Sequence, residues 1–189
     1  MRTEQLVECC IRRGYISEKQ APWLNYALKK NIATLFASFP ILMLTSYLAT
    51  PVAACFFYFS FGWIRSRTNG LHAKSFIGCM VASLFCAWFF MGPLYKLITV
   101  PIMQALLCLS TVVIWFFSPF DHPNMHLTNE EKIACMNSAR RRLLFLLLGA
   151  NVLHKINQQE AAAGIVLGVS MAALLLALAY LFKGEGGER

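Results

Sequence analysis

The fold is indicated most clearly by residues 161–182, which read AAAGIVLGVSMAALLLALAYLF. This stretch has no charged residue, and it reaches the length of about 20 residues that a helix needs to cross the core of a bilayer. Similar apolar stretches come before it, at residues 32–49, 52–64, 75–95, 97–117 and 143–153. The series predicts an all-α, polytopic membrane protein with about six transmembrane helices. Because 52–64 and 143–153 are short, five or four complete spans are alternatives.

The composition supports a membrane protein. Of the 189 residues, 58% are hydrophobic and 14% are charged, whereas soluble domains have about 45–50% and about 25%. This excludes a disordered chain and disfavours a soluble fold. The seven cysteines are odd in number and contain no CxxC pair, so neither a disulfide framework nor a zinc site is indicated.

The net charge of +8 could indicate nucleic-acid binding, but its distribution indicates a membrane. Fifteen of the 17 Lys and Arg residues lie in four segments, 1–30, 65–74, 118–142 and 183–189. The connections on the opposite side hold only Lys96 and Lys155. By the positive-inside rule, both termini and the two basic loops are cytoplasmic. We therefore expect no nucleic-acid partner, and the lipid bilayer is the surrounding medium.

We interpret residues 1–189 as a single membrane domain. It consists of a cytoplasmic interfacial segment (1–30), a transmembrane bundle (31–182) with cytoplasmic loops 65–74 and 118–142, and a cytoplasmic tail (183–189). The interfacial segment is expected to form amphipathic helices, the first of them ending at Gly14, although a plain cytoplasmic leader is an alternative. Thr128-Asn-Glu-Glu131 has the pattern of a capping box, which predicts a helix that runs through Arg140–Arg142 into the fifth span.

The most chemically suggestive segment is residues 65–79, RSRTNGLHAKSFIGC. Its His72 and Cys79 could act as general base and nucleophile, because a neighbouring imidazolium favours the reactive thiolate. On one continuous helix the two side chains would be about 10 Å apart along the axis, so a catalytic pair requires the helix to begin after His72. The Asn69-Gly70 turn would let the imidazole fold back. A packing cysteine and a solvated histidine are the alternative.

Other chemistries lack their motifs. No G-x-S-x-G, H-E-x-x-H or phosphate-binding glycine loop occurs. His122 and His126 flank a proline, which disfavours a metal site. Because the spans carry charged residues only at their ends, ion-coupled transport is also disfavoured. The sequence indicates neither a metal nor a cofactor.

The motif resembles the signature of the AgrB family, the membrane cysteine endopeptidases of bacterial quorum sensing. The resemblance is carried by Arg65, Gly70, His72-Ala73 and Cys79, and by a second landmark that begins at Ser118-Pro119. The length, the basic loops and the six-span hydropathy agree over the whole chain. Asn69 stands where the family commonly has a glycine.

The resemblance implies that Cys79 is the nucleophile and His72 the general base. The substrate would be an AgrD-like propeptide, cut before its acidic tail through an acyl-thioester and released as a cyclic thiolactone or lactone. It also implies a homodimer in the bacterial cytoplasmic membrane, with the active site near the cytoplasmic face. Candidate substrate contacts are Arg65, Arg67, Asn69, Gly70 and Ser75. Lys132 and Arg140–Arg142 could attract the tail or serve only to set the topology. A non-catalytic transporter subunit or assembly scaffold is the alternative function.

Overall fold

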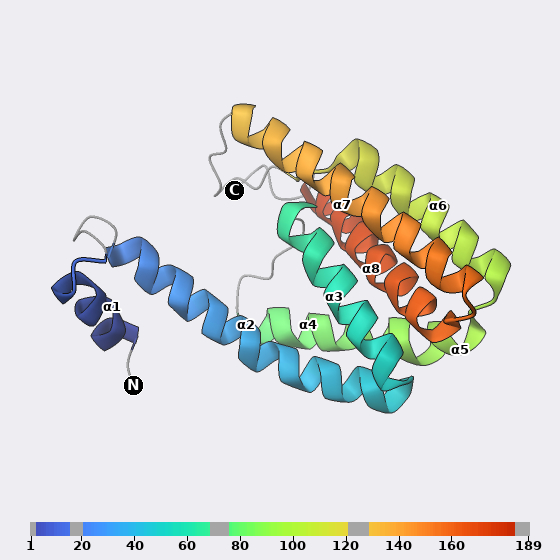
Figure 1. The fold of residues 1–189 in the computed structure, drawn as a ribbon, viewed down its shortest axis with the longest axis horizontal. Helices are drawn as coiled ribbons and strands as arrows, with labels where there is room; N and C mark the ends of the chain where they lie inside the picture. Colours follow the sequence, from blue (N-terminus) through green and yellow to red (C-terminus); the bar gives the residue numbers. More distant parts are fainter. Residues whose placement is uncertain (1–2, 16–20, 69–75, 121–128, 184–189) are drawn as a thin grey trace. The chain divides into compact units, whose positions relative to one another are not determined.

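The computed structural model describes residues 3–15, 21–68, 76–120 and 129–183, and in these ranges it contains helices and no strand. Some side chains within the helices, including that of Cys79, lie outside the described part. The chain divides into two compact units, Met1–Ile41 and Leu42–Arg189. Figure 1 follows the order of the helices along the chain. The all-helical class predicted from the sequence is confirmed for the described residues.

The first unit contains α1 (Thr3–Arg12) and most of α2 (Ala21–Leu48). α1 ends where the sequence predicts, because Gly14 takes a φ of +73°, a conformation that glycine adopts without strain. The Gly14 amide donates to the carbonyl of Ile11 and the Tyr15 amide to that of Cys10, as in a Schellman cap. On the apolar face of α1, Val7 is buried.

The second unit begins within α2 and continues with α3 (Pro51–Thr68), which contains the short apolar stretch 52–64. The helix is longer than its apolar part because it includes Arg65 and Arg67 in its last turn. Positive charges near a helix C-terminus are favoured by the helix dipole, and arginine side chains can extend to the membrane surface.

The next helices are α4 (Phe76–Phe89), the π-helical segment η2 (Phe90–Leu94) and α5 (Tyr95–Leu97), followed by α6 (Val100–Phe117). The helical break lies at Ile98 and Thr99, both extended. Leu97 therefore ends the third apolar segment rather than beginning the fourth. The reason is Pro101, which favours the first turn of a helix because it has no amide hydrogen to donate.

Two long helices complete the chain, α7 (Asn129–Lys155) and α8 (Gln159–Lys183). α7 runs from Asn129 through Arg140–Arg142 into the fifth apolar stretch, as the sequence predicts. Thr128 of the expected capping box lies outside the described residues. A tight turn at Asn157, with a φ of 64°, reverses the chain between the two helices.

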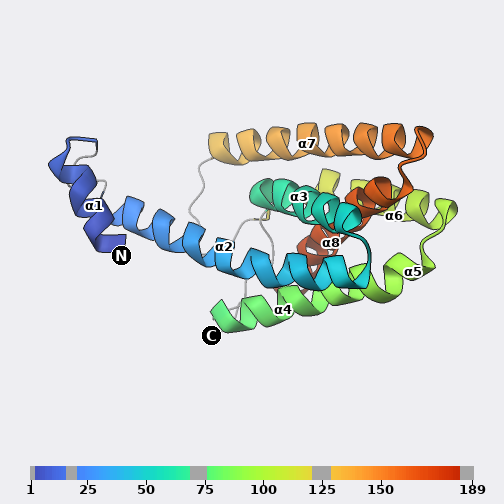
Figure 2. The same ribbon diagram turned by 60° about the horizontal axis from the view of Figure 1, so that its bottom comes forward.

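α8 is the central helix of the second unit and packs against α3, α6 and α7 (Figures 1 and 2). Every residue from 161 to 173 is buried. Gly164 and Gly168 make close contact with α3 possible, because a Cβ on Gly164 would meet the backbone of Ala53 and one on Gly168 would meet Ser60 and Phe57. Small residues four positions apart allow helices to approach in this way in membranes. A buried hydrogen bond of 3.0 Å between Ser110 and Ser170 joins α6 to α8.

Among the described residues, three helical segments are long and apolar enough to cross a membrane, namely Met80–Leu97, Val100–Phe117 and Gln159–Leu181. The last is 78% buried inside the protein, whereas the first two are only 22% and 17% buried. The exposed apolar side chains of α4 and α6 would therefore face lipid if these helices cross a bilayer.

Candidate active site

The structure describes only part of the site predicted from the sequence. His72, Asn69, Gly70 and Ser75 lie outside the described residues. Cys79 is the fourth residue of α4, which begins at Phe76. The residues just before Phe76, His72 among them, lie outside the described part of the chain, so the geometry of a His72–Cys79 pair stays a prediction from the sequence.

The chain leads into this segment from the last turn of α3. Arg65 there is half-buried and Arg67 is exposed. Both are therefore at the end of the helix that leads to His72, where the sequence predicts substrate contacts. Their role in substrate binding stays a prediction from the sequence.

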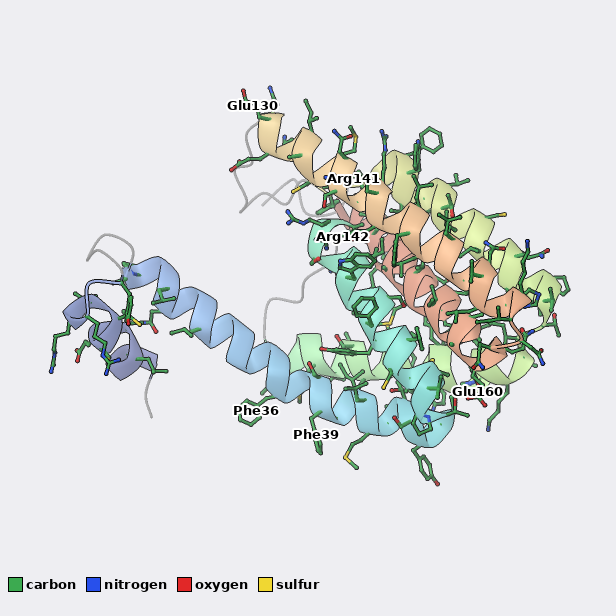
Figure 3. The ribbon with its side chains drawn as sticks, viewed as in Figure 1. Phe36, Phe39, Glu130, Arg141, Arg142 and Glu160 are labelled. Carbon is green, nitrogen blue, oxygen red and sulfur yellow. The ribbon has the colours of Figure 1, made fainter. Side chains whose placement is uncertain are left out.

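Arg142 of α7 holds the C-terminal part of α3 (Figure 3). Its Nη1 donates to the backbone carbonyl of Trp63 at 2.7 Å and to the hydroxyl of Ser66 at 2.6 Å. Its Cζ lies 5.6 Å from the centroid of the Trp63 ring, within the range of a cation–π interaction. One turn further along α7, Phe145 packs edge-on against Trp63, with ring centroids 5.3 Å apart.

Arg140 makes the corresponding contact with α6. Its Nη2 donates to the carbonyl of Trp115 at 3.1 Å, and its Cζ lies 4.7 Å from the centroid of that ring. The amide of Phe120, just after α6, donates to the carbonyl of Thr68 at 3.0 Å. The C-terminal ends of α3 and α6 and the basic part of α7 therefore meet at one end of the second unit.

The opposite end is built from different groups. Thr50 donates a hydrogen bond of 2.8 Å to Glu160, which Figure 3 shows at the other end of α8 from Arg142. His154, for which the sequence indicates no partner, lies 2.8 Å through its Nδ1 from the Oε1 of Gln159. Because α3 and α8 both begin at this end, α3, α6 and α8 run in the same direction and α7 runs against them.

Positive charge accumulates at the end that carries the arginines. Partial burial, together with the nearby charge of Arg67, lowers the pKa of the Arg142 guanidinium from its ordinary value. Arginine remains protonated in proteins, so Arg67 and Arg142 together form a positively charged region at the end of α3. Within the described residues, no group of three His, Cys, Asp or Glu side chains could hold a metal ion.

The sequence did not predict the contacts of Arg140 and Arg142 with helix carbonyls. The basic run suggests attraction of an acidic tail or a topological role, whereas the structure shows both side chains bonded to helix carbonyls. A partial signal was present, because a tryptophan stands near the end of each apolar stretch that these arginines contact. The pair Gly164 and Gly168 was readable from its spacing alone, as a small-xxx-small pattern in an apolar helix.

Comparison with known proteins gives one family. The family model described as accessory gene regulator B (AgrB) matches residues 4–176, which include α1 to α7 and most of α8. No curated protein and no solved structure gives a significant match.

Proposed function

Because the chain belongs to the accessory gene regulator B family, which takes part in processing quorum-sensing propeptides, we propose that it is a membrane cysteine endopeptidase. Its substrate is an AgrD-like propeptide with an amphipathic helix, an internal Cys or Ser and an acidic C-terminal tail. The observation that supports the proposal most is the match to the family model over residues 4–176, together with a sequence in which His72 precedes Cys79 of α4 by seven positions.

The reaction has two steps. The acyl group of the propeptide passes first to Cys79 and then to the internal residue of the propeptide. The Cys79 thiolate attacks the carbonyl carbon before the acidic tail, and the peptide C–N bond breaks. The His72 imidazolium gives its proton to the leaving amine, so the tail departs with a free amino terminus and an acyl-thioester remains on Cys79. The internal cysteine of the propeptide then gives its thiol proton to the neutral His72 and attacks this thioester, and Cys79 leaves as the thiolate.

The product is a cyclic thiolactone, or a lactone where the internal residue is serine. Ring closure is favoured over hydrolysis because the attacking group is held in the same molecule. Thioester exchange is nearly balanced in energy, whereas forming a thioester from an amide is uphill. Removal of the released tail therefore draws the first step forward. No cofactor is required.

The proposed setting is the bacterial cytoplasmic membrane, with six spans, both termini inside and the site at the cytoplasmic face. Three apolar helices support a membrane protein. The parallel course of α3, α6 and α8 supports placing the ends that lead to 65–74 and 118–142 on one side. The charge bias assigns that side to the cytoplasm. We also propose a homodimer, on the family resemblance alone.

The test is the replacement Cys79→Ala in cells that also produce an AgrD-like propeptide. We expect the propeptide to stay uncut, because the nucleophile is lost, while the protein still inserts in the membrane. Cys86→Ala is the matched control, because Cys86 lies seven residues further along the same helix and should be dispensable. Cleavage that persists in Cys79→Ala would favour a non-catalytic transporter subunit or scaffold.

A further inference from the structure

We propose that Arg142 is a positioning residue for the His72–Cys79 pair, because it fixes the turn of α3 from which the chain leads to His72. The inference rests on the proposed function and adds to it a residue outside the signature motif. Arg142 lies 70 positions after His72, so nothing in the spacing of the motif indicates it.

The contact combines two hydrogen bonds with a cation–π contact. One guanidinium nitrogen donates to two acceptors on α3, the Trp63 carbonyl at 2.7 Å and the Ser66 hydroxyl at 2.6 Å, and Cζ lies 5.6 Å from the centroid of the Trp63 ring. Ser66 itself donates to the Trp63 carbonyl at 2.9 Å. Hydrogen bonds with a charged donor are roughly twice as strong as neutral ones. Arg142 therefore holds the last two turns of α3 against α7.

The short connection makes this anchor relevant to the site. α3 ends at Thr68, and His72 is four residues beyond it, so the Cα of His72 can lie at most about 14 Å from the Cα of Thr68. Cys79 is attached to a separate helix, α4. A shift of the end of α3 relative to the rest of the unit therefore changes where His72 can meet Cys79.

Arg140 cannot replace this contact. Two residues apart on a helix, Arg140 and Arg142 point about 200° apart, and Arg140 reaches α6 instead. The hydrogen bond from Phe120 to Thr68 also ties the end of α3 to the segment after α6. Arg142 is thus the side chain of α7 that donates hydrogen bonds to Trp63 and Ser66 near the end of α3.

The contacts favour positioning over attraction of the acidic tail. The Nη1 of Arg142 donates to a carbonyl and a hydroxyl, and its Cζ lies 5.6 Å from the centroid of the Trp63 ring. An arginine that binds substrate would lower KM through its charge. An arginine that holds a catalytic group in place instead affects the rate of the chemical step, since a misplacement of 1 Å can cost about 100-fold in rate.

The experiment compares Arg142→Gln, Arg142→Lys and the wild-type chain in lipid vesicles, with an AgrD-like propeptide. We expect Arg142→Gln to lower kcat about tenfold with KM nearly unchanged, and Arg142→Lys to recover part of the loss, because its ammonium can still donate to the same carbonyl. Ser66→Ala should have a smaller effect that is not additive with Arg142→Gln. Lys155→Gln, which removes a charge from the exposed far end of α7, is the matched control.

A second measurement separates positioning from general destabilisation. The rate at which iodoacetamide alkylates Cys79 is followed against pH by mass spectrometry of the peptide that contains it. If Arg142 sets the His72–Cys79 geometry, the alkylation midpoint of Arg142→Gln moves to higher pH, toward that of a free thiol near 8.5. This readout does not depend on cleavage.

The outcomes are distinct. A higher KM with unchanged kcat in Arg142→Gln would assign Arg142 to tail binding and overturn the inference. An unchanged alkylation profile, whether or not thermal stability falls, would make its role structural only and overturn it too. If the wild-type protein cleaves nothing, the proposed function fails, while the alkylation profile still decides whether Arg142 governs the environment of Cys79.

Discussion

At the scale of single residues, the chemistry depends on whether His72 shifts Cys79 toward the thiolate. In the proposed site an imidazolium beside the sulfur would favour the thiolate. Without that imidazolium Cys79 would be a weaker nucleophile at neutral pH.

Replacing His72 by Ala tests this pair. We expect cleavage at neutral pH to fall by about 100-fold or more, the usual contribution of a general acid–base group. Activity should partly return at high pH, as the unassisted thiol ionises. His154→Ala, at the opposite end of the unit, is the control. A pH–rate profile for His72→Ala that matches the wild type would remove His72 from the mechanism.

The four residues His72, Cys79, Arg140 and Arg142 show how much of the candidate site could be predicted from the sequence. His72 and Cys79 are recognisable because their seven-residue spacing and the Asn69-Gly70 turn are local features. The contacts of Arg140 and Arg142 are not, because they depend on which helices lie beside α7, and no local pattern encodes that choice. The charge of these residues was evident from the sequence, but their acceptors were not.

At the scale of helices, α3 and α8 pack closely because Gly164 and Gly168 of α8 have no Cβ. We expect Gly168→Ala to lower the free energy of unfolding by about 1–3 kcal/mol, the usual cost of overpacking. A Cβ there would meet Ser60 and the backbone of Phe57. Thermal unfolding in detergent measures the effect.

Gly62→Ala is the matched control, because a Cβ at that position of α3 meets nothing within 4 Å. This variant should be neutral, or more stable because alanine favours helix by about 1 kcal/mol. Equal loss of stability in both variants would show that the effect of Gly168→Ala comes from the glycine's backbone rather than from close packing.

The helices themselves were largely predictable. Each of the six apolar stretches lies mostly in a helix, and Gly14 marks the end of α1 correctly. The exceptions among the described residues are Ala49, which follows α2, and Ile98 and Thr99, which form the break before α6. The boundaries were less accurate where charge was taken to end a span, as at Arg65, since α3 continues to Thr68. Charged side chains can occupy the last turn of a helix and still reach water, so charge marks the end of the apolar part rather than the end of the helix.

At the scale of the whole molecule, the account predicts that α7 crosses the membrane despite its short apolar part. In a chain whose native cysteines are replaced by serine, Asn129→Cys should react with a membrane-impermeant maleimide only after cells are permeabilised. Gln158→Cys, in the turn after α7, should react in intact cells. Labelling of both positions from the same side would show that α7 does not cross.

The proposed topology explains why the chain carries a net charge of +8. In the proposed topology, most of the positive residues lie on the cytoplasmic side, to which we also assign the ends of α3 and α6 and the Arg142 anchor. An acidic propeptide tail would be attracted to the same face. The same positive charges can therefore both set the topology and attract the acidic tail of the substrate. The kinetics of variants such as Arg142→Gln distinguish between such roles for a single residue.

The most direct test of the central claim is the intact mass of the protein after it is mixed with an AgrD-like propeptide in lipid vesicles and quenched in acid. The account predicts an adduct whose mass equals the propeptide without its tail, attached to Cys79 and released by hydroxylamine, as expected of a thioester. The adduct should be absent in Cys79→Ala. Cleavage of the tail with no such adduct, or an adduct that persists in Cys79→Ala, would contradict it.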